Sequence, residues 1–138
     1  MLDMHDPRHA HIDHRLRNDL IIWLGTVRPD GRPHLVPVWF LWDGASVLIL
    51  SEPDTQKVRN LRHDARVTLA LDDTHHGADV IVIEGTAELV ADPASAVTPP
   101  AYATKYAANM ARMSLDAHSM VARYSQAIRI SPVRFVGE

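Results

Sequence analysis

Short apolar runs separated by turn-forming residues make up most of this chain. Residues 6–19 are mainly polar and predict a lead-in helix, and the apolar run over 20–24 predicts a strand. Prolines and a glycine within residues 28–33 favour a tight turn, so we expect a second strand to return antiparallel over 34–42. The first two strands therefore form a hairpin.

The rest of the chain continues this pattern, with a helical segment before the last strand. Asp43 and Gly44 form a second turn signal and lead into apolar residues 47–50, which would complete a three-strand meander. Pro99 and Pro100 suit the start of a helical region, and Ser114 suits the N-cap of a second short helix. The remaining expected elements are a helix over 54–64, strands over 67–71, 79–90 and 127–136, and loops over 72–77 and 92–100.

Six expected strands with few helices and mostly short connections predict a mainly β domain, either an antiparallel barrel or a sandwich. The strand over 34–42 refines this expectation because both of its faces are apolar. One face can fill a barrel, while the other meets a second subunit or a flat aromatic ligand. The two faces are Val36, Val38, Phe40 and Trp42 on one side and Leu35, Pro37, Trp39 and Leu41 on the other.

Length, charge and cysteine content exclude several classes of function. A chain of 138 residues is one domain of ordinary size, and its net charge of −3 argues against nucleic acid as the main partner. The absence of cysteine excludes disulfides, thiolate zinc sites and cysteine nucleophiles. The first residues lack the features of a signal peptide, and no apolar run is long enough to span a membrane, so we expect a cytoplasmic protein.

The most informative stretch is 50–57, where an apolar strand runs into hydroxyls and a lysine at an expected helix start. Backbone N–H groups at a helix N-terminus are unpaired, and the helix dipole favours an anion there. Ser51, Thr55 and Lys57 can each add a hydrogen-bond donor, so this junction predicts a phosphate site. Lys57 is conspicuous because Lys105 is the only other lysine among 14 basic residues.

Plainer interpretations stay open for several of these residues. Residues 55–61 also fit a capped amphipathic helix whose charges point into water. Tyr102 and Tyr106, four residues apart, are expected to pack against the barrel, with substrate contact as the alternative. The tryptophans are more typical of core or interface anchors than of catalytic groups: Trp23, Trp39 and Trp42.

The histidines suggest weaker alternatives. His11 and His14 share a helical face near His9, which would allow a divalent metal, but a frayed N-terminus offers such ligands no supporting shell. We therefore expect no metal site. His75 and His76 belong to a polar loop, where exposure is the ordinary state and proton donation above a bound ring is the alternative.

Several short motifs occur together in a recognisable order. Residues 31–40 read Gly-Arg-Pro-His-Leu-Val-Pro-Val-Trp-Phe, and an Asp-Gly turn, Leu50-Ser51 and Thr55-x-Lys57-x-x-Asn60-Leu61 follow. This order and spacing resemble the pyridoxamine 5'-phosphate oxidase-like split β-barrel superfamily. Within it, the chain is most similar to small actinobacterial F-420-dependent enzymes, the flavin/deazaflavin oxidoreductases. The resemblance implies a six-stranded antiparallel split β-barrel of the FMN-binding type with flanking short helices, spanning 1–138 as a single domain.

The resemblance also implies a cofactor site. In the family, the hydroxyl that ends the third strand and the Ser/Thr-x-Lys at the next helix start bind the cofactor phosphate, and the second strand lines the ring. The family further implies a homodimer with the site at the subunit interface, and a small-molecule substrate. The implied cofactor-binding residues are Val36, Pro37, Val38, Trp39, Leu50, Ser51, Thr55, Lys57 and Asn60.

One departure from the family pattern bears on the cofactor. The oxidases carry basic residues at both ends of a segment where this chain has Leu35 and Phe40. This loss argues against tight FMN binding and against oxidation of pyridoxamine phosphate. It favours the deazaflavin coenzyme F-420, whose phosphate is a diester with a smaller charge than the terminal monoester of FMN. FMN remains the alternative cofactor.

The expected function is therefore that of an F-420-dependent oxidoreductase, which transfers a hydride from the reduced cofactor to an unsaturated or quinone-like small molecule. Because a flavin-type cofactor carries the hydride itself, we expect no catalytic side chain. Two other classes stay open: an FMN-dependent oxidase or reductase, and a non-catalytic binder or carrier of a flavin, deazaflavin or haem. Hydride transfer needs no diagnostic side chain, so the sequence does not separate the enzyme from the carrier.

Overall fold

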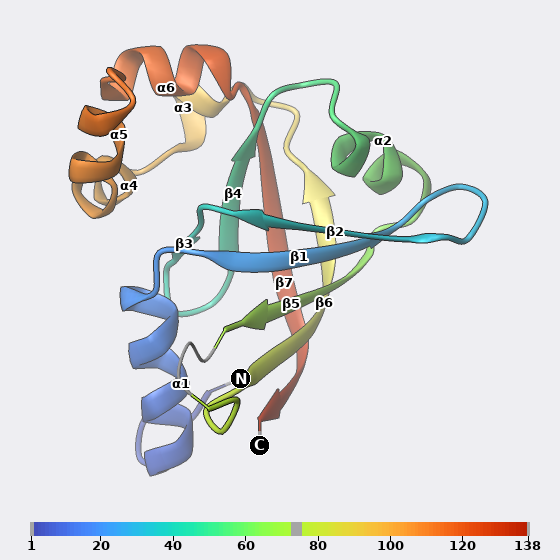
Figure 1. Ribbon diagram of the computed structural model, residues 1–138, viewed down its shortest axis with the longest axis vertical. Coiled ribbons are helices and arrows are strands. Elements are labelled where there is room, and N and C mark those ends of the chain that lie inside the picture. The colour runs from blue at the N-terminus through green and yellow to red at the C-terminus, as the bar shows by residue number, and fades with distance from the viewer. Residues whose placement is uncertain (1, 73–75, 138) are drawn as a thin grey trace.

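A computed structural model describes residues 2–72 and 76–137 (Figure 1). Within these residues, an antiparallel sheet of seven strands has the order β2-β1-β5-β6-β7-β4-β3. The strands are β1 (Ile22–Val27), β2 (Pro33–Val38), β3 (Leu41–Trp42), β4 (Val47–Ser51), β5 (Arg66–Leu71), β6 (Ile81–Leu89) and β7 (Gln126–Gly137). The helices are α1 (Pro7–Asn18), α2 (Gln56–His63), α3 (Ala94–Val97), α4 (Pro100–Lys105), α5 (Ala107–Arg112) and α6 (Ala117–Arg123).

The two edge strands of the sheet, β2 and β3, are consecutive in the chain, so the segment between them joins the two edges. This arrangement confirms the predicted antiparallel split barrel, with seven strands in place of six. Helices α3 to α6 gather at one end of the sheet, and α1 lies toward the other end, near the two termini (Figure 1). None of the described helices is long and apolar enough to cross a membrane.

The seventh strand arises because the strand predicted over 34–42 is interrupted. The backbone N–H of Phe40 donates to the Tyr106 hydroxyl at 2.8 Å, and the Phe40 carbonyl lies 3.0 Å from the same hydroxyl. Because these contacts hold the backbone between Val38 and Leu41, the chain leaves β1 and pairs next with β4. The predicted three-strand meander is therefore present in interrupted form, because the middle segment pairs with β1 through β2 and with β4 through β3.

Turn and cap chemistry explains where several elements begin. The Asp6 carboxylate accepts from the backbone N–H of Arg8, and Pro7 occupies the first position of α1. Gly31 and Gly44 have φ of 89° and 96°, in the left-handed region that favours glycine. Both predicted turns are therefore confirmed.

The helical segment before the last strand differs from the prediction at two points. Residues 94–97, expected in a loop, form α3. Ser114 does not cap α6, because the Asp116 carboxylate accepts from the Ser119 N–H while the Ser119 hydroxyl accepts from the Asp116 N–H. This reciprocal capping box starts the helix at Ala117. Ser114 instead has a φ of 57° after the end of α5.

The apolar core has two parts, and the interrupted strand contributes to both. Phe40 and Trp42 enter the larger cluster inside the sheet. Trp39 and Leu41 pack against the second cluster, which lies between β4 and the helices α3 to α6. Leu35, before the interruption, is 62% exposed. The predicted two-faced strand is thus buried on both faces only beyond Val38.

Candidate functional site

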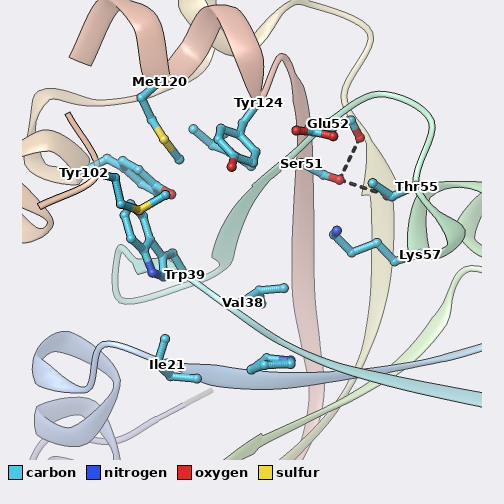
Figure 2. Close-up of a pocket in the computed structure, with 13 residues that line it drawn as sticks. Ile21, Val38, Trp39, Ser51, Glu52, Thr55, Lys57, Tyr102, Met120 and Tyr124 are labelled. Atoms are coloured by element: carbon cyan, nitrogen blue, oxygen red, sulfur yellow. Dashed lines mark hydrogen bonds between the residues drawn. The ribbon is translucent and has the colours of Figure 1, made fainter. Parts of the chain in front are cut away.

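A cavity of about 400 Å³ lies between the end of β4, the start of α2 and the helices α4 and α6 (Figure 2). Its volume falls in the range of small-molecule sites. Hydroxyls and an ammonium group occupy one end, and aromatic and methionine side chains occupy the other (Figure 2). The lining residues are Ile21, Pro37, Val38, Trp39, Leu50, Ser51, Glu52, Thr55, Lys57, Tyr102, Met113, Met120 and Tyr124.

Strand β4 and helix α2 bring two hydroxyls together at the polar end. Ser51 ends β4 and is 1% exposed. Its Oγ donates to the Glu52 carbonyl at 2.8 Å and lies 3.0 Å from Oγ1 of Thr55. Thr55 is the N-cap residue of α2, yet its side chain makes no capping hydrogen bond. Backbone N–H groups in the first turn of α2 therefore remain available to an anion.

Lys57 adds a positive charge to the same end. Its ammonium group points toward the hydroxyls of Ser51 and Thr55 (Figure 2). Burial lowers the pKa of Lys57, and the attraction of Glu52 partly offsets this. The Glu52 carboxylate is itself paired with Arg123 at 3.0 Å. Among the described residues, no acceptor forms a hydrogen bond or ion pair with the Lys57 ammonium. Its positive charge is therefore unpaired within these residues.

Trp39 forms a fixed wall at the aromatic end. Its ring stacks on Tyr106 with ring centroids 4.5 Å apart and an interplanar angle of 4°. Tyr106 is fully buried, and its hydroxyl is held by the Phe40 backbone and by the Leu20 carbonyl at 2.8 Å. A flat ring in the cavity would therefore meet an indole that is already held in place by its neighbour.

The second lysine, Lys105, lies behind this wall, and its ammonium group has partners within the protein. Its Nζ donates to the Phe40 carbonyl at 2.9 Å and sits 3.7 Å from the centroid of the Phe40 ring. Burial lowers the pKa of Lys105 to about 8, and the attraction of Asp19 partly offsets this. Lys105 therefore supports the interrupted strand and does not line the cavity.

Comparison with known proteins identifies the family. A family model described as Pyridoxamine 5'-phosphate oxidase matches residues 9–136. The chain belongs to the pyridoxamine 5'-phosphate oxidase family. The resemblance inferred from the motifs of residues 31–61 is thereby confirmed.

Solved structures with this family's fold include proteins of different kinds. An F-420 reductase is 26% identical, with a TM-score of 0.68 and coverage of 90% of this chain and 94% of that one. A conserved hypothetical protein from Mycobacterium tuberculosis is also 26% identical, with a TM-score of 0.76 and coverage of 93% and 82%. The haem storage protein HutZ from Vibrio cholerae is 16% identical, with a TM-score of 0.61 and coverage of 93% and 92%. At that identity the likeness to HutZ shows the fold alone.

The cavity brings together most of the residues that the family resemblance implies. Val36 and Asn60 are the exceptions. Val36 pairs with Leu24 in the β1–β2 ladder. Asn60 is fully buried and donates to Thr26 Oγ1 at 2.9 Å, which ties α2 to β1. The implied residues that do line the cavity are Pro37, Val38, Trp39, Leu50, Ser51, Thr55 and Lys57.

Sequence reasoning missed the part of the wall that the helices supply. The spacing of Tyr102 and Tyr106 was visible, but it indicated packing against the barrel, and both side chains are indeed buried. No local pattern predicts that α4 and α6 fold back over β4. Tyr102 was expected to contact a ligand only as the alternative interpretation, and the lining residues missed are Ile21, Glu52, Met113, Met120 and Tyr124.

The described histidines among those singled out in the sequence do not line this cavity. His11 Nε2 is 2.8 Å from Asp79 Oδ1, and this hydrogen bond is the main cause that lowers the pKa of Asp79. Arg15 reaches the same carboxylate at 2.9 Å. His75 falls outside the described residues, and His76 is exposed. The His11 imidazole is therefore part of a surface ion-pair cluster.

Proposed function

We propose that this protein is an F-420-dependent oxidoreductase. The observation that carries the proposal is Lys57, a half-buried cation without an acceptor in the described residues, directed at two hydroxyls beside a helix start. Such an arrangement suits an anion that brings its own negative charge into the cavity. The solved F-420 reductase, 26% identical over most of both chains, supports this choice within the family.

The charge available in the cavity favours a phosphate diester. Among the described residues, Lys57 is the only basic residue in the lining, and Glu52, the one acidic residue there, is paired with Arg123. Leu35 and Phe40 stand where the oxidases carry basic residues. Both side chains are apolar, with Leu35 exposed on the outer face and Phe40 buried in the core, so neither adds a cation. One ammonium group matches the single charge of a diester, as in F-420, better than the double charge of the FMN monoester.

Several lining residues would bind and orient the cofactor. Lys57 would pair with the phosphate, and Ser51 and Thr55 would donate hydrogen bonds to it after their hydroxyls turn from the Glu52 carbonyl and from each other. Val38 and Trp39 would lie against the ring. The bound cofactor supplies the hydride, and the protein orients it and excludes water. The buried tyrosine and methionine side chains of α4 and α6 make the aromatic end suitable for an apolar acceptor.

A second copy of the chain would complete the site in this proposal. The outer face of β1 and β2 exposes a hollow lined in part by Trp23, Leu35 and Ala70. Leu35 is 62% exposed, and apolar surface of this kind is typical of an interface. We expect a homodimer in sedimentation experiments at micromolar concentration. A monomer under those conditions would contradict an interface site.

Parallel titration of the purified protein with F-420 and with FMN tests the cofactor. We expect tighter binding of F-420. Oxidation of reduced F-420 is then followed against a panel of enones and quinones. Tight FMN binding with none for F-420 would overturn the proposal, and F-420 binding without turnover of any acceptor would indicate a carrier. Among the residues that the structure describes, no histidine lines the cavity, so none of the described histidines is placed to ligate a haem there.

A further inference from the structure

The side chain of Tyr102 carries a hydroxyl that forms no hydrogen bond with the described residues. The side chain is 2% exposed and belongs to the cavity lining. Its hydroxyl is buried and has no hydrogen-bond partner among the described residues. Buried tyrosine hydroxyls are usually paired, and an unpaired one in a native structure requires an explanation.

Within the part of the chain that the structure describes, no neighbour of Tyr102 accepts a hydrogen bond from its hydroxyl. The Tyr106 ring lies 5.1 Å away between centroids, and the Tyr106 hydroxyl is committed to the Phe40 and Leu20 backbone. Trp39 and Met120 are the nearby cavity side chains in Figure 2. Burial raises the pKa of Tyr102, so the phenol stays protonated at physiological pH and remains a donor.

The position of Tyr102 separates its role from that of the anion-binding residues. Ser51, Thr55 and Lys57 lie at one end of the cavity, whereas Tyr102 lies at the aromatic end (Figure 2). A ligand that reaches this end is bounded mainly by apolar surface and meets the Tyr102 hydroxyl, a buried donor without a partner among the described residues. The ligand part that fits is flat and apolar with one exposed acceptor oxygen.

We propose that Tyr102 donates a hydrogen bond to the carbonyl oxygen of the hydride acceptor, which selects enones and quinones. This inference rests on the proposed function. When the hydride adds to the β-carbon of an enone, a C–H bond forms and the carbon–carbon π bond breaks. The electron pair moves to the carbonyl oxygen, and the cofactor that gave up the hydride is oxidised. Solvent then protonates the α-carbon, while Tyr102 stabilises the charge that developed on oxygen.

Ligand pairs that differ only in the carbonyl group test this role without turnover. Menadione and 2-methylnaphthalene have nearly the same shape, and only menadione offers carbonyl oxygens. Their binding is measured by tryptophan fluorescence in the presence of oxidised F-420, which cannot donate a hydride. We expect Tyr102→Phe to weaken menadione about 3- to 10-fold and to leave 2-methylnaphthalene unchanged.

Thr98→Val is the matched control. Thr98 Oγ1 is also buried without a partner in the described residues, but Thr98 does not line the cavity. We expect this variant to keep the wild-type preference for menadione. Both variants remove an unsatisfied hydroxyl, so each should keep or raise the melting temperature. A Tyr102→Phe protein that melts lower and loses both ligands equally would make the hydroxyl structural and overturn the inference.

The same titrations separate this inference from the proposed function. If the protein binds no F-420, the proposed function fails. The ratio of the affinity for menadione to the affinity for 2-methylnaphthalene is then measured without cofactor. A ratio that Tyr102→Phe lowers would still support the hydrogen bond to a carbonyl ligand. A ratio unchanged by Tyr102→Phe, with or without F-420, overturns it.

Discussion

The two lysines of this chain are both partly buried, but they differ in whether the ammonium group has a partner. Both are partly buried, and burial lowers the pKa of each. Lys105 donates to the Phe40 carbonyl at 2.9 Å and sits over the Phe40 ring, whereas Lys57 has no acceptor among the described residues. The difference teaches that burial alone does not mark a binding residue. What marks Lys57 is a partly buried charge without a partner among the described residues, close to two hydroxyls.

The same contrast extends to the two ends of the cavity. At the wall formed by Trp39, the hydroxyl of Tyr106 and the ammonium of Lys105 are both bonded to backbone groups. At the start of α2, Thr55 does not cap the helix, and Lys57 is unpaired within the described chain. We therefore expect substitutions at the Trp39 wall to affect stability and substitutions at the start of α2 to affect ligand binding.

Tyr106→Phe should have the largest effect on stability. Removing the hydroxyl leaves the buried N–H of Phe40 without its partner, which should cost about 1–3 kcal/mol of unfolding free energy. Urea unfolding measures this loss, and Tyr124→Phe is the control because Tyr124 is only half-buried. Equal stability of the two variants would contradict the comparison between the two ends of the cavity. The wall formed by Trp39 would then not depend on the hydrogen bond between Phe40 N–H and the Tyr106 hydroxyl.

Thr55→Val should have a smaller effect, and on binding alone. The substitution keeps the shape of the side chain but removes a donor 3.0 Å from Ser51 Oγ, so F-420 should bind about 3- to 10-fold more weakly. Thr104→Val removes an exposed hydroxyl on α4 and should change neither binding nor stability. If Thr55→Val bound F-420 as tightly as the wild type and the control do, the Thr55 hydroxyl would have no part in the anion site.

Lys105→Met should have an effect that is visible as a difference in pH dependence. The pKa of Lys105 is about 8 in the folded protein and about 10.5 in the unfolded chain. Between these values the unfolded chain binds more protons, so the stability of the wild type rises with pH relative to the variant. Urea unfolding of both proteins at pH 7 and at pH 9.5 measures the change. If the stability of the wild type fell relative to the variant over this range, the lowered pKa of Lys105 would be contradicted.

Much of the fold was predictable because alternating apolar runs and turn residues act locally. The interruption between Val38 and Leu41 was not, because the hydroxyl that causes it comes from Tyr106, on a helix far along the chain. The start of α6 was misassigned to Ser114 although Asp116 and Ser119 form a local capping pattern that the sequence contains. One error therefore arose from tertiary structure, and the other from an overlooked signal.

The candidate site was predictable only where it is contiguous in sequence. Ser51, Thr55 and Lys57 lie within one strand-to-helix junction, and the structure places all three in the cavity wall. Tyr102 comes from a helix whose position over β4 no local pattern specifies. The roles of Lys57 and Lys105 could not be distinguished either, because a lysine's partners are a property of the folded chain.

Titration of F-420 into the wild type, Lys57→Gln and Lys105→Gln tests the central claim most directly. Both substitutions remove one positive charge from a partly buried site, so they change the net charge of the protein equally. We predict that Lys57→Gln weakens F-420 binding about 10- to 100-fold, as expected for a charge-assisted hydrogen bond, while Lys105→Gln binds nearly as the wild type. Wild-type affinity in Lys57→Gln, or an equal loss in both variants, would contradict the account.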